Sequence, residues 1–211
     1  MSFARDTVYD AAVGVAIADD RDDLSAFLKP GCAAAVWRRQ IPQHIDSWLD
    51  KIAPENLPKT RVILPSHAIV QTLTHVCDMA GLKASKERAW LCNDIASLAE
   101  TFSSLMSAQF LRIRLDVIDT NACRKFHIDA LTARLVCTYR GTGTQYGVST
   151  DGADPTRVFT VQTGCPILLR GTEWPTQPAS GLLHRSPPIA GTGETRLVLV
   201  LDPVINPDDA T

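Results

Sequence analysis

Four residues in the second half of the chain have the types and the spacing needed to bind a metal ion and a carboxylate. His127 and Asp129 are two positions apart, a lone histidine follows at His184, and Arg196 comes twelve residues later. Two imidazoles and one carboxylate can occupy one face of an iron(II) ion and leave its other positions open. A guanidinium can hold a carboxylate through two parallel hydrogen bonds. We therefore predict a metal site made of His127, Asp129 and His184, with Arg196 binding a ligand carboxylate.

The predicted strands explain how these residues could meet. Side chains two apart on a strand point the same way, so His127 and Asp129 can reach one ion. The third ligand must come from a distant strand, and His184 ends the predicted strand at 182–184. Arg196 enters the segment TRLVLVL (195–201), whose consecutive apolar residues predict burial on both faces. A charged side chain there needs a partner, which is either a ligand carboxylate or a protein acid.

Each of these residues also has an ordinary structural interpretation. His127 can be a strand-end histidine, His184 can cap a turn, and Arg196 can form a structural ion pair. The order along the chain favours the metal interpretation, because the pair follows one strand, His184 closes a later one and the arginine enters the next. The same three ligands can hold zinc instead of iron.

The first half of the chain reads as mainly helical. A helix is predicted after Pro42, a second after Ser66 with Gly81 just past its end, and a third from Ser85. The third has the cleanest helical period, and its apolar positions are Leu91, Ile95, Leu98, Phe102 and Leu105. Short strands are predicted at 32–38 and 60–64.

From residue 110 the period changes to that of strands. Predicted strands separated by turns rich in Gly, Pro, Thr and Asp lie at 110–118, 133–139, 156–162, 166–171, 182–184 and 195–201. Many short strands at fairly regular spacing are typical of a sandwich or a jelly-roll barrel. We therefore predict a single α+β domain over 1–211. Its mainly helical part with short strands (1–108) packs on a jelly-roll or cupin-like barrel (109–202) that carries the metal site.

Composition excludes several classes of partner. Of the 211 residues 45% are hydrophobic, and the net charge of −2 comes from interspersed charges, which gives no reason to expect nucleic acid or a membrane surface as partner. The sequence contains no run of about 18 apolar residues, so no membrane span is predicted. The N-terminus lacks the pattern of a secretory signal, so none is expected. The six cysteines form no CxxC pair, so zinc-ribbon spacing is absent and buried thiols are expected. A cytoplasmic location is predicted.

Three stretches resemble a known superfamily. RKFHIDALTARLVCTYRGTGTQY (124–146), PILLRGTEWPTQPASGLLHRSPP (166–188) and ETRLVLVLD (194–202) are similar to the double-stranded β-helix barrel of the iron(II)/2-oxoglutarate-dependent oxygenases. More closely, they resemble a bacterial family known only as a domain of unknown function. The resemblance covers roughly residues 110 to 202.

The resemblance implies iron(II) and 2-oxoglutarate as cofactors. His127, Asp129 and His184 would be the iron ligands, and Arg196 would hold the 2-oxoglutarate carboxylate, with Tyr139 or Thr138 adding a hydrogen bond. The implied function is that of a hydroxylase-type dioxygenase, with no motif that specifies a small-molecule or protein substrate. Two alternatives stay open. One is a non-catalytic metal-binding jelly-roll protein of zinc or iron homeostasis, and the other is an interaction module with a vestigial site.

Three further residues are candidates for the substrate pocket. Arg134 lies on the strand after the His127–Asp129 pair, Arg185 follows His184, and Trp174 lies in the turn GTEWP. The structural alternative for each arginine is a solvated or ion-paired side chain, and Trp174 can instead cover the end of the core.

Overall fold

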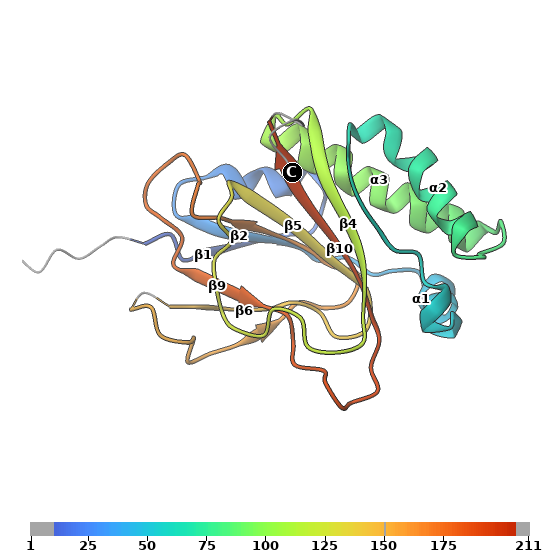
Figure 1. Ribbon diagram of the computed structural model, residues 1–211. Helices are drawn as coiled ribbons and strands as arrows, with labels where there is room; N and C mark the ends of the chain where they lie inside the picture. Colours follow the sequence, from blue (N-terminus) through green and yellow to red (C-terminus); the bar gives the residue numbers. More distant parts are fainter. Residues whose placement is uncertain (1–10, 150, 206–211) are drawn as a thin grey trace, which may run out of the picture.

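Two β-sheets and a layer of helices make up the fold (Figure 1). The computed structural model describes residues 11–149 and 151–205. The large sheet has the strand order β1-β2-β8-β5-β10-β4-β3 and the small sheet the order β7-β6-β9. The strands of the large sheet are β1 (Gly14–Ala18), β2 (Cys32–Trp37), β3 (Thr60–Leu64), β4 (Phe110–Ile118), β5 (Ala133–Arg140), β8 (Pro166–Arg170) and β10 (Arg196–Val204). Those of the small sheet are β6 (Gln145–Val148), β7 (Phe159–Thr160) and β9 (Leu182–Arg185).

The helices lie on the side of the large sheet that faces away from the small sheet (Figure 1). They are α1 (Gln43–Lys51), α2 (Ile69–Met79) and α3 (Lys86–Met106), and short 3-10 turns form η1 (Asp22–Leu28), η2 (Pro54–Asn56) and η3 (Ser66–Ala68). The hydroxyl of Ser85 caps α3 by accepting from the Arg88 backbone N–H at 3.1 Å. The predicted Ser66 cap is wrong, because η3 precedes α2 and Ser66 makes no such bond.

The large sheet separates two hydrophobic cores. Leu197, Leu199 and Leu201 of β10 pack on the helix side, whereas Val198 and Val200 face the small sheet. This alternation follows from the two-residue period of a strand. The burial of β10 on both faces, predicted from its continuous apolar run, is confirmed.

Most predicted elements are present, and the exceptions have physical causes. The strands at 60–64 and 110–118 have the predicted bounds, but the strand predicted at 156–162 is reduced to β7. The strand β1 was not predicted, and β6 was not predicted because its segment looks like a glycine-rich turn. Gly147 within β6 is needed for close packing, since a Cβ there would lie 2.5 Å from the Arg157 carbonyl oxygen. Helices packed on a sheet confirm the mixed helix-and-sheet prediction.

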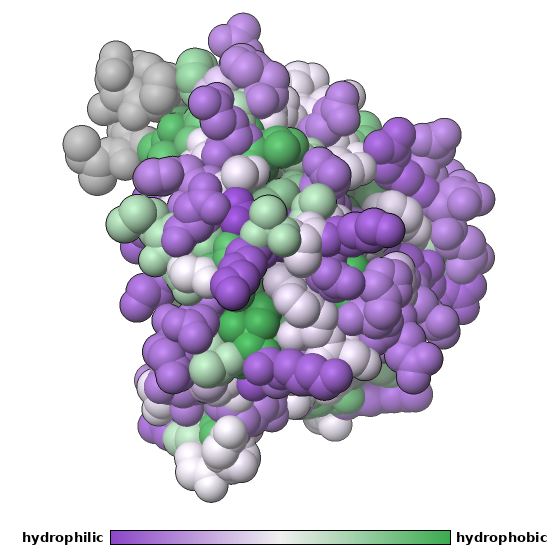
Figure 2. Space-filling view, turned by 90° about the vertical axis from the view of Figure 1, so that its right-hand side faces the viewer, coloured by the Kyte–Doolittle hydropathy of each residue, from purple (hydrophilic) through white to green (hydrophobic). Residues whose placement is uncertain are grey.

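The surface and the cysteines add two observations. The side of the molecule at the right of Figure 1 is mostly hydrophilic, with small apolar areas between the polar side chains (Figure 2). Within 11–149 and 151–205, no helix is both long enough and apolar enough to span a bilayer. All six cysteines are free thiols, of which Cys123 is exposed and the other five are buried as expected.

A buried polar network fastens the sheet to α3. Asp94 on α3 accepts from both terminal nitrogens of Arg39, at 2.6 and 2.7 Å, and from the Tyr139 hydroxyl at 2.6 Å. Burial raises the pKa of Tyr139, so its hydroxyl stays protonated and donates. The network joins three segments that are distant in the sequence.

Replacing Asp94 tests the role of this network. Asp94→Ala leaves Arg39 without a carboxylate partner in a mostly buried position, and we expect the free energy of unfolding to fall by about 3 kcal/mol. The matched control is Asp19→Ala, because Asp19 pairs with Arg38 at 2.7 Å on the surface and its loss should cost under about 1 kcal/mol. Urea unfolding of both variants measures the difference, and equal effects would contradict the prediction.

Candidate metal centre

The two histidines face each other through a backbone bridge. The His127 N–H donates to the His184 carbonyl at 3.1 Å, and the His184 N–H donates back to the His127 carbonyl at 3.0 Å. Residues paired in this way project their side chains on the same side of a sheet. The ring centroids accordingly lie 4.5 Å apart. The bridge joins the segment at His127 to the free edge of β9, so this one backbone pairing determines the positions of both imidazole rings.

Asp129 completes a cluster with these rings. Its Oδ2 lies 3.1 Å from His184 Nε2, and its Oδ1 lies 3.6 Å from His127 Nε2. One potential ligand atom from each of the three residues lies within 4.8 Å of the others. Oδ2 is buried, its 3.1 Å contact with His184 Nε2 lacks hydrogen-bond geometry, and no other described residue donates to it. The three groups that the sequence spacing selected are therefore gathered around one point.

The protonation states suit metal binding. His127 Nδ1 lies 2.9 Å from the Lys125 carbonyl oxygen, which fixes the proton on Nδ1 and leaves Nε2 free as a ligand atom. Burial lowers the pKa of His184 and outweighs the opposing effect of Asp129, so this ring is neutral at pH 7. Burial opposes the charge on Asp129, but the neighbouring His184 and Arg134 outweigh it, and the pKa of the carboxyl lies below its usual value.

Arg134 of β5 holds the carboxylate of the cluster. One of its terminal nitrogens donates to Asp129 Oδ1. The same guanidinium binds both oxygens of the buried Asp202 on β10, at 2.6 and 2.8 Å. Because Asp202 anchors Arg134 from the central strand, the position of Asp129 is tied to the large sheet. Arg134 therefore contacts a candidate metal ligand, and it also lines the cleft beside these ligands, which is compatible with the pocket position that the sequence suggested.

The cluster lies at a cleft between the two sheets. The cleft has a volume of 150 Å³, and its walls include Val136, Val198 and Val200 of the large sheet. Arg114, Thr144 and Arg185 also line it. His184 is 7% exposed. The candidate ligands are thus shielded at His184 and Asp129, beside an apolar wall, whereas the His127 side chain is 33% exposed to solvent.

Arg196 extends the same face of β10 beyond this wall. It alternates with Val198 and Val200, so it lies on the face of β10 that looks toward the small sheet, although it is not one of the residues that line the cleft. Its Nε donates to the Thr142 carbonyl at 2.6 Å. One terminal nitrogen lies 3.4 Å from the Thr138 hydroxyl, and the other, Nη1, is buried without a partner among the described residues. Burial lowers the pKa of Arg196 to about 10.

Two predicted pocket residues lie elsewhere. Tyr139 is on the helix side of the large sheet, where its hydroxyl binds Asp94, so it cannot serve a ligand between the sheets. Thr138, the alternative to Tyr139, is the residue that reaches Arg196. Trp174 packs against Phe27 and under Arg170 and does not line the cleft. It covers the end of the helix-side core.

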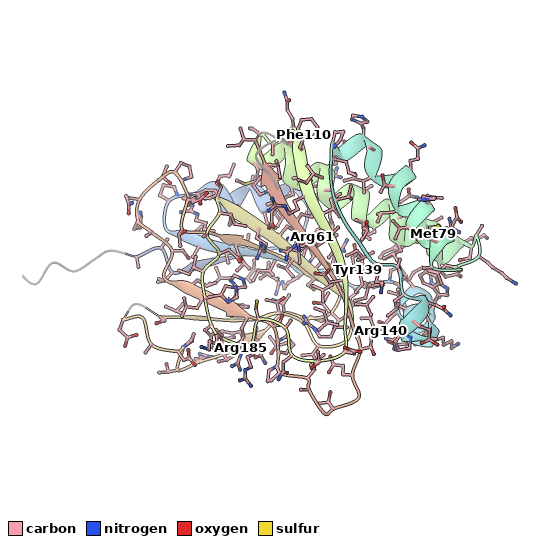
Figure 3. All side chains as sticks on the ribbon, in the orientation of Figure 1. Arg61, Met79, Phe110, Tyr139, Arg140 and Arg185 are labelled. Carbon is pink, nitrogen blue, oxygen red and sulfur yellow. The ribbon has the colours of Figure 1, made fainter. Side chains whose placement is uncertain are left out.

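Two arginines, Arg185 and Arg114, form part of the walls of the cleft. Arg185 lines the cleft, and its Nε donates to Gln145 while its guanidinium stacks on Phe126. Figure 3 shows Arg185 on the small sheet and Tyr139 near the end of β5, away from it. Sequence reasoning missed Arg114, because the polar face of the alternating segment 110–118 was expected to face solvent. The alternation itself was the signal, since it places Arg114 on one face with Asp116.

The overall fold is similar to that of known dioxygenases. Dioxygenase for auxin oxidation 1 from Arabidopsis thaliana, solved as a complex with 2-oxoglutarate, matches with a TM-score of 0.54 and 10% identity over 93% of this chain and 94% of that one. The dioxygenase for auxin oxidation in rice matches with a TM-score of 0.51 and 12% identity over 93% of this chain and 84% of that one. At such low identity the likeness establishes the fold alone.

The sequence itself defines the family. The chain belongs to the family described as protein of unknown function, DUF1826, whose model matches residues 18–202. This confirms the resemblance to a family known only as a domain of unknown function, and the two solved structures show a fold similar to that of dioxygenases. No curated protein matches the sequence with significance.

Removing a ligand residue tests the cluster. We expect His127→Ala and Asp129→Ala each to lose stoichiometric binding of iron(II) or zinc, because two remaining ligands hold such ions weakly. Metal content after dialysis and calorimetric titration measure this, and circular dichroism checks that the fold is kept. His67→Ala, which removes a histidine outside the cluster, is the control. Full metal retention by either ligand variant would exclude that residue from the site.

Replacing Arg134 tests how the carboxylate is held. Arg134→Gln removes the donor to Asp129, and we expect metal affinity to fall about 10- to 100-fold, as for other partners of metal ligands. Arg185→Gln removes the same charge from the same cleft without touching Asp129, so its metal affinity should change little. Equal losses in both variants would point to a general charge effect instead.

Proposed function

We propose that this protein is an iron(II)/2-oxoglutarate-dependent oxygenase of the hydroxylase type. The observation that carries the proposal is the combination of the clustered His127, Asp129 and His184 with the unpaired guanidinium nitrogen of Arg196 between the same two sheets. A protein that only binds metal has no need of Arg196. The fold shared with the two dioxygenases is compatible with this function.

The strand connections support a double-stranded β-helix as the framework. Four strands of the large sheet are neighbours in the order β4-β10-β5-β8, and the small sheet has the order β9-β6-β7 with His127 bridged to β9. From β4 onward the chain passes from one sheet to the other and back, as a jelly roll does. The ligands then come from two neighbouring segments of the small sheet, and Arg196 comes from the central strand of the large one.

The residues fit a divalent metal ion. Asp129 presents a buried oxygen without a hydrogen-bond partner among the described residues, and His127 presents Nε2 because its other nitrogen binds Lys125. Two neutral imidazoles and one carboxylate are the donors expected for iron(II) with open positions. The same donors can hold zinc, which is the ion of the alternative function in metal homeostasis.

The surroundings of Arg196 fit a carboxylate. A buried guanidinium without an acidic partner is costly, and burial lowers the pKa of this one. No ion pair joins Arg196 to an acid in the described part of the chain, although Glu194 is near enough to oppose the loss of charge. A bound carboxylate would give Nη1 the partner that it lacks. This supports Arg196 as the residue that binds the far carboxylate of 2-oxoglutarate.

In this proposal the protein provides position and a shielded environment. Iron(II) and 2-oxoglutarate supply, when bound, the dioxygen-dependent oxidation of a substrate C–H bond. Arg134 and Asp202 keep Asp129 ionised and oriented, and Val198 and Val200 keep water from part of the cleft. Thr138 and Thr142 fix the guanidinium of Arg196 in advance of binding, which lowers the entropic cost.

Anaerobic titration tests the proposal. Adding iron(II) and then 2-oxoglutarate should produce the weak visible absorption band of an iron–2-oxo acid chelate. Arg196→Gln should weaken 2-oxoglutarate binding about tenfold or more, because it removes charged hydrogen bonds to the cosubstrate. Iron(II) affinity should stay within about twofold, because the protein partners of Arg196 are Thr138 and Thr142 and not the candidate metal ligands.

The control and the contrary outcomes are distinct. Arg185→Gln removes an arginine that already has protein partners and should leave both affinities near those of the unaltered protein. No visible band with tightly bound iron would favour the metal-homeostasis function. Equal losses of iron and 2-oxoglutarate in Arg196→Gln would show that this arginine is structural.

A further inference from the structure

Arg114, like Arg196, is an arginine whose charge the protein does not fully match. It lies on β4 directly opposite Val200 of β10, on the face that looks toward the small sheet. It lines the same cleft as His127, Asp129 and His184. Its side chain is 22% exposed, so part of it is open to solvent.

The acids around Arg114 are already engaged or too far away. Its single ion pair in the described part of the chain is a long one, 3.4 Å to Asp202 Oδ2. Asp202 is bound more closely by Arg134 through both of its oxygens. Asp116 also lines the cleft but forms no ion pair with Arg114 within residues 11–149 and 151–205. Arg114 Nε is buried and has no hydrogen-bond partner there.

Neighbouring positive charges add to this imbalance. Arg61 of β3 is the cross-strand partner of Arg114, and like charges placed opposite each other are destabilising. Figure 3 shows Arg61 on the strand at this edge of the large sheet. Burial lowers the pKa of Arg114, and the charge of Arg134 lowers it further. Asp202, the acid in contact with Arg114, is shared with Arg134, so an anion bound at Arg114 would compensate a charge that is only partly matched.

Arg114 and Arg196 serve different parts of the space between the sheets. Arg196 is bound by Thr138, which is paired with Val198 of β10. Arg114 instead contacts Asp202. Along β10, Asp202 follows Val200, whereas Val198 precedes it. The two guanidinium groups are thus held toward opposite ends of the strand. The carboxylate assigned to Arg196 therefore does not account for Arg114.

We propose that Arg114 binds an anionic oxygen group, a carboxylate or a phosphate, of the molecule that this protein oxidises. The identification of that molecule as the substrate rests on the proposed oxygenase function, whereas the anion site itself does not. The bidentate geometry of a guanidinium suits both groups. A substrate held by its acidic group at Arg114 would have its neighbouring atoms in the cleft beside the metal ligands. The substrate class is accordingly a small organic acid or a phosphorylated compound.

Anion binding to the full-length chain without metal tests this site. Inorganic phosphate and acetate are titrated separately by calorimetry at constant ionic strength, with chloride as the reference ion. At least one should bind, and Arg114→Gln should weaken that binding about tenfold or more. Arg185→Gln removes an equal charge from the same cleft and should change it by no more than about twofold. Arg114→Lys should restore part of the affinity, because it keeps the charge without the bidentate fork.

The outcomes separate the two proposals. Preference for phosphate or for acetate identifies the acidic group of the substrate. Equal losses in Arg114→Gln and Arg185→Gln, or no binding of either anion, would overturn the anion site. If Arg114→Gln does not fold, phenylglyoxal labelling of the unaltered chain decides, since the anion should slow labelling at Arg114 and absence of protection refutes the site. A missing 2-oxoglutarate band with intact anion binding would refute only the oxygenase function.

Discussion

The candidate metal centre depends on one backbone interaction, the pair of hydrogen bonds between His127 and His184. These bonds place two imidazoles on one side of the small sheet, although the residues come from distant parts of the sequence. The carboxylate is then set from the other sheet, because Arg134 joins Asp129 to Asp202 on β10. The three candidate ligands are therefore held by both sheets at once, and the position of each sheet relative to the other fixes the shape of the cluster.

Strand periodicity explains which residues of the candidate site could be placed from the sequence. The His127–Asp129 spacing and the position of Arg196 on β10 followed from the rule that alternate residues share a face. The same rule excludes Tyr139, because Arg134 and Tyr139 are five positions apart on β5 and so lie on opposite faces. Arg114 could also have been placed in this way once the polar face of β4 was known to be covered. Sequence alone does not say which face of a half-polar strand another sheet will cover.

Helices and strands could be predicted from the sequence where their apolar residues follow a clear pattern over many positions. The apolar runs of β2 and β10 and the helical period of α3 were recognisable because each signal extends over many residues. The strand β6 was hidden because Gly147 serves close packing instead of a turn, and β7 is too short to carry a pattern. The pairing of Asp202 with Arg134 was not predictable, since it depends on β10 lying beside β5 in the folded sheet.

The single bridge at His127 has a consequence for the coupling of folding to ligand binding. Between the end of β4 and the start of β5 the chain forms no long strand, and few backbone bonds join it to the β9 region: the bridge at His127 and the Ser186 N–H, which donates to the Cys123 carbonyl at 2.9 Å. A cation shared by residues 127, 129 and 184 would cross-link this segment to β9 and close a long loop. Part of the binding energy would then appear as added local stability. The structural order of the segment between β4 and β5 would therefore depend on whether a metal ion occupies the candidate site.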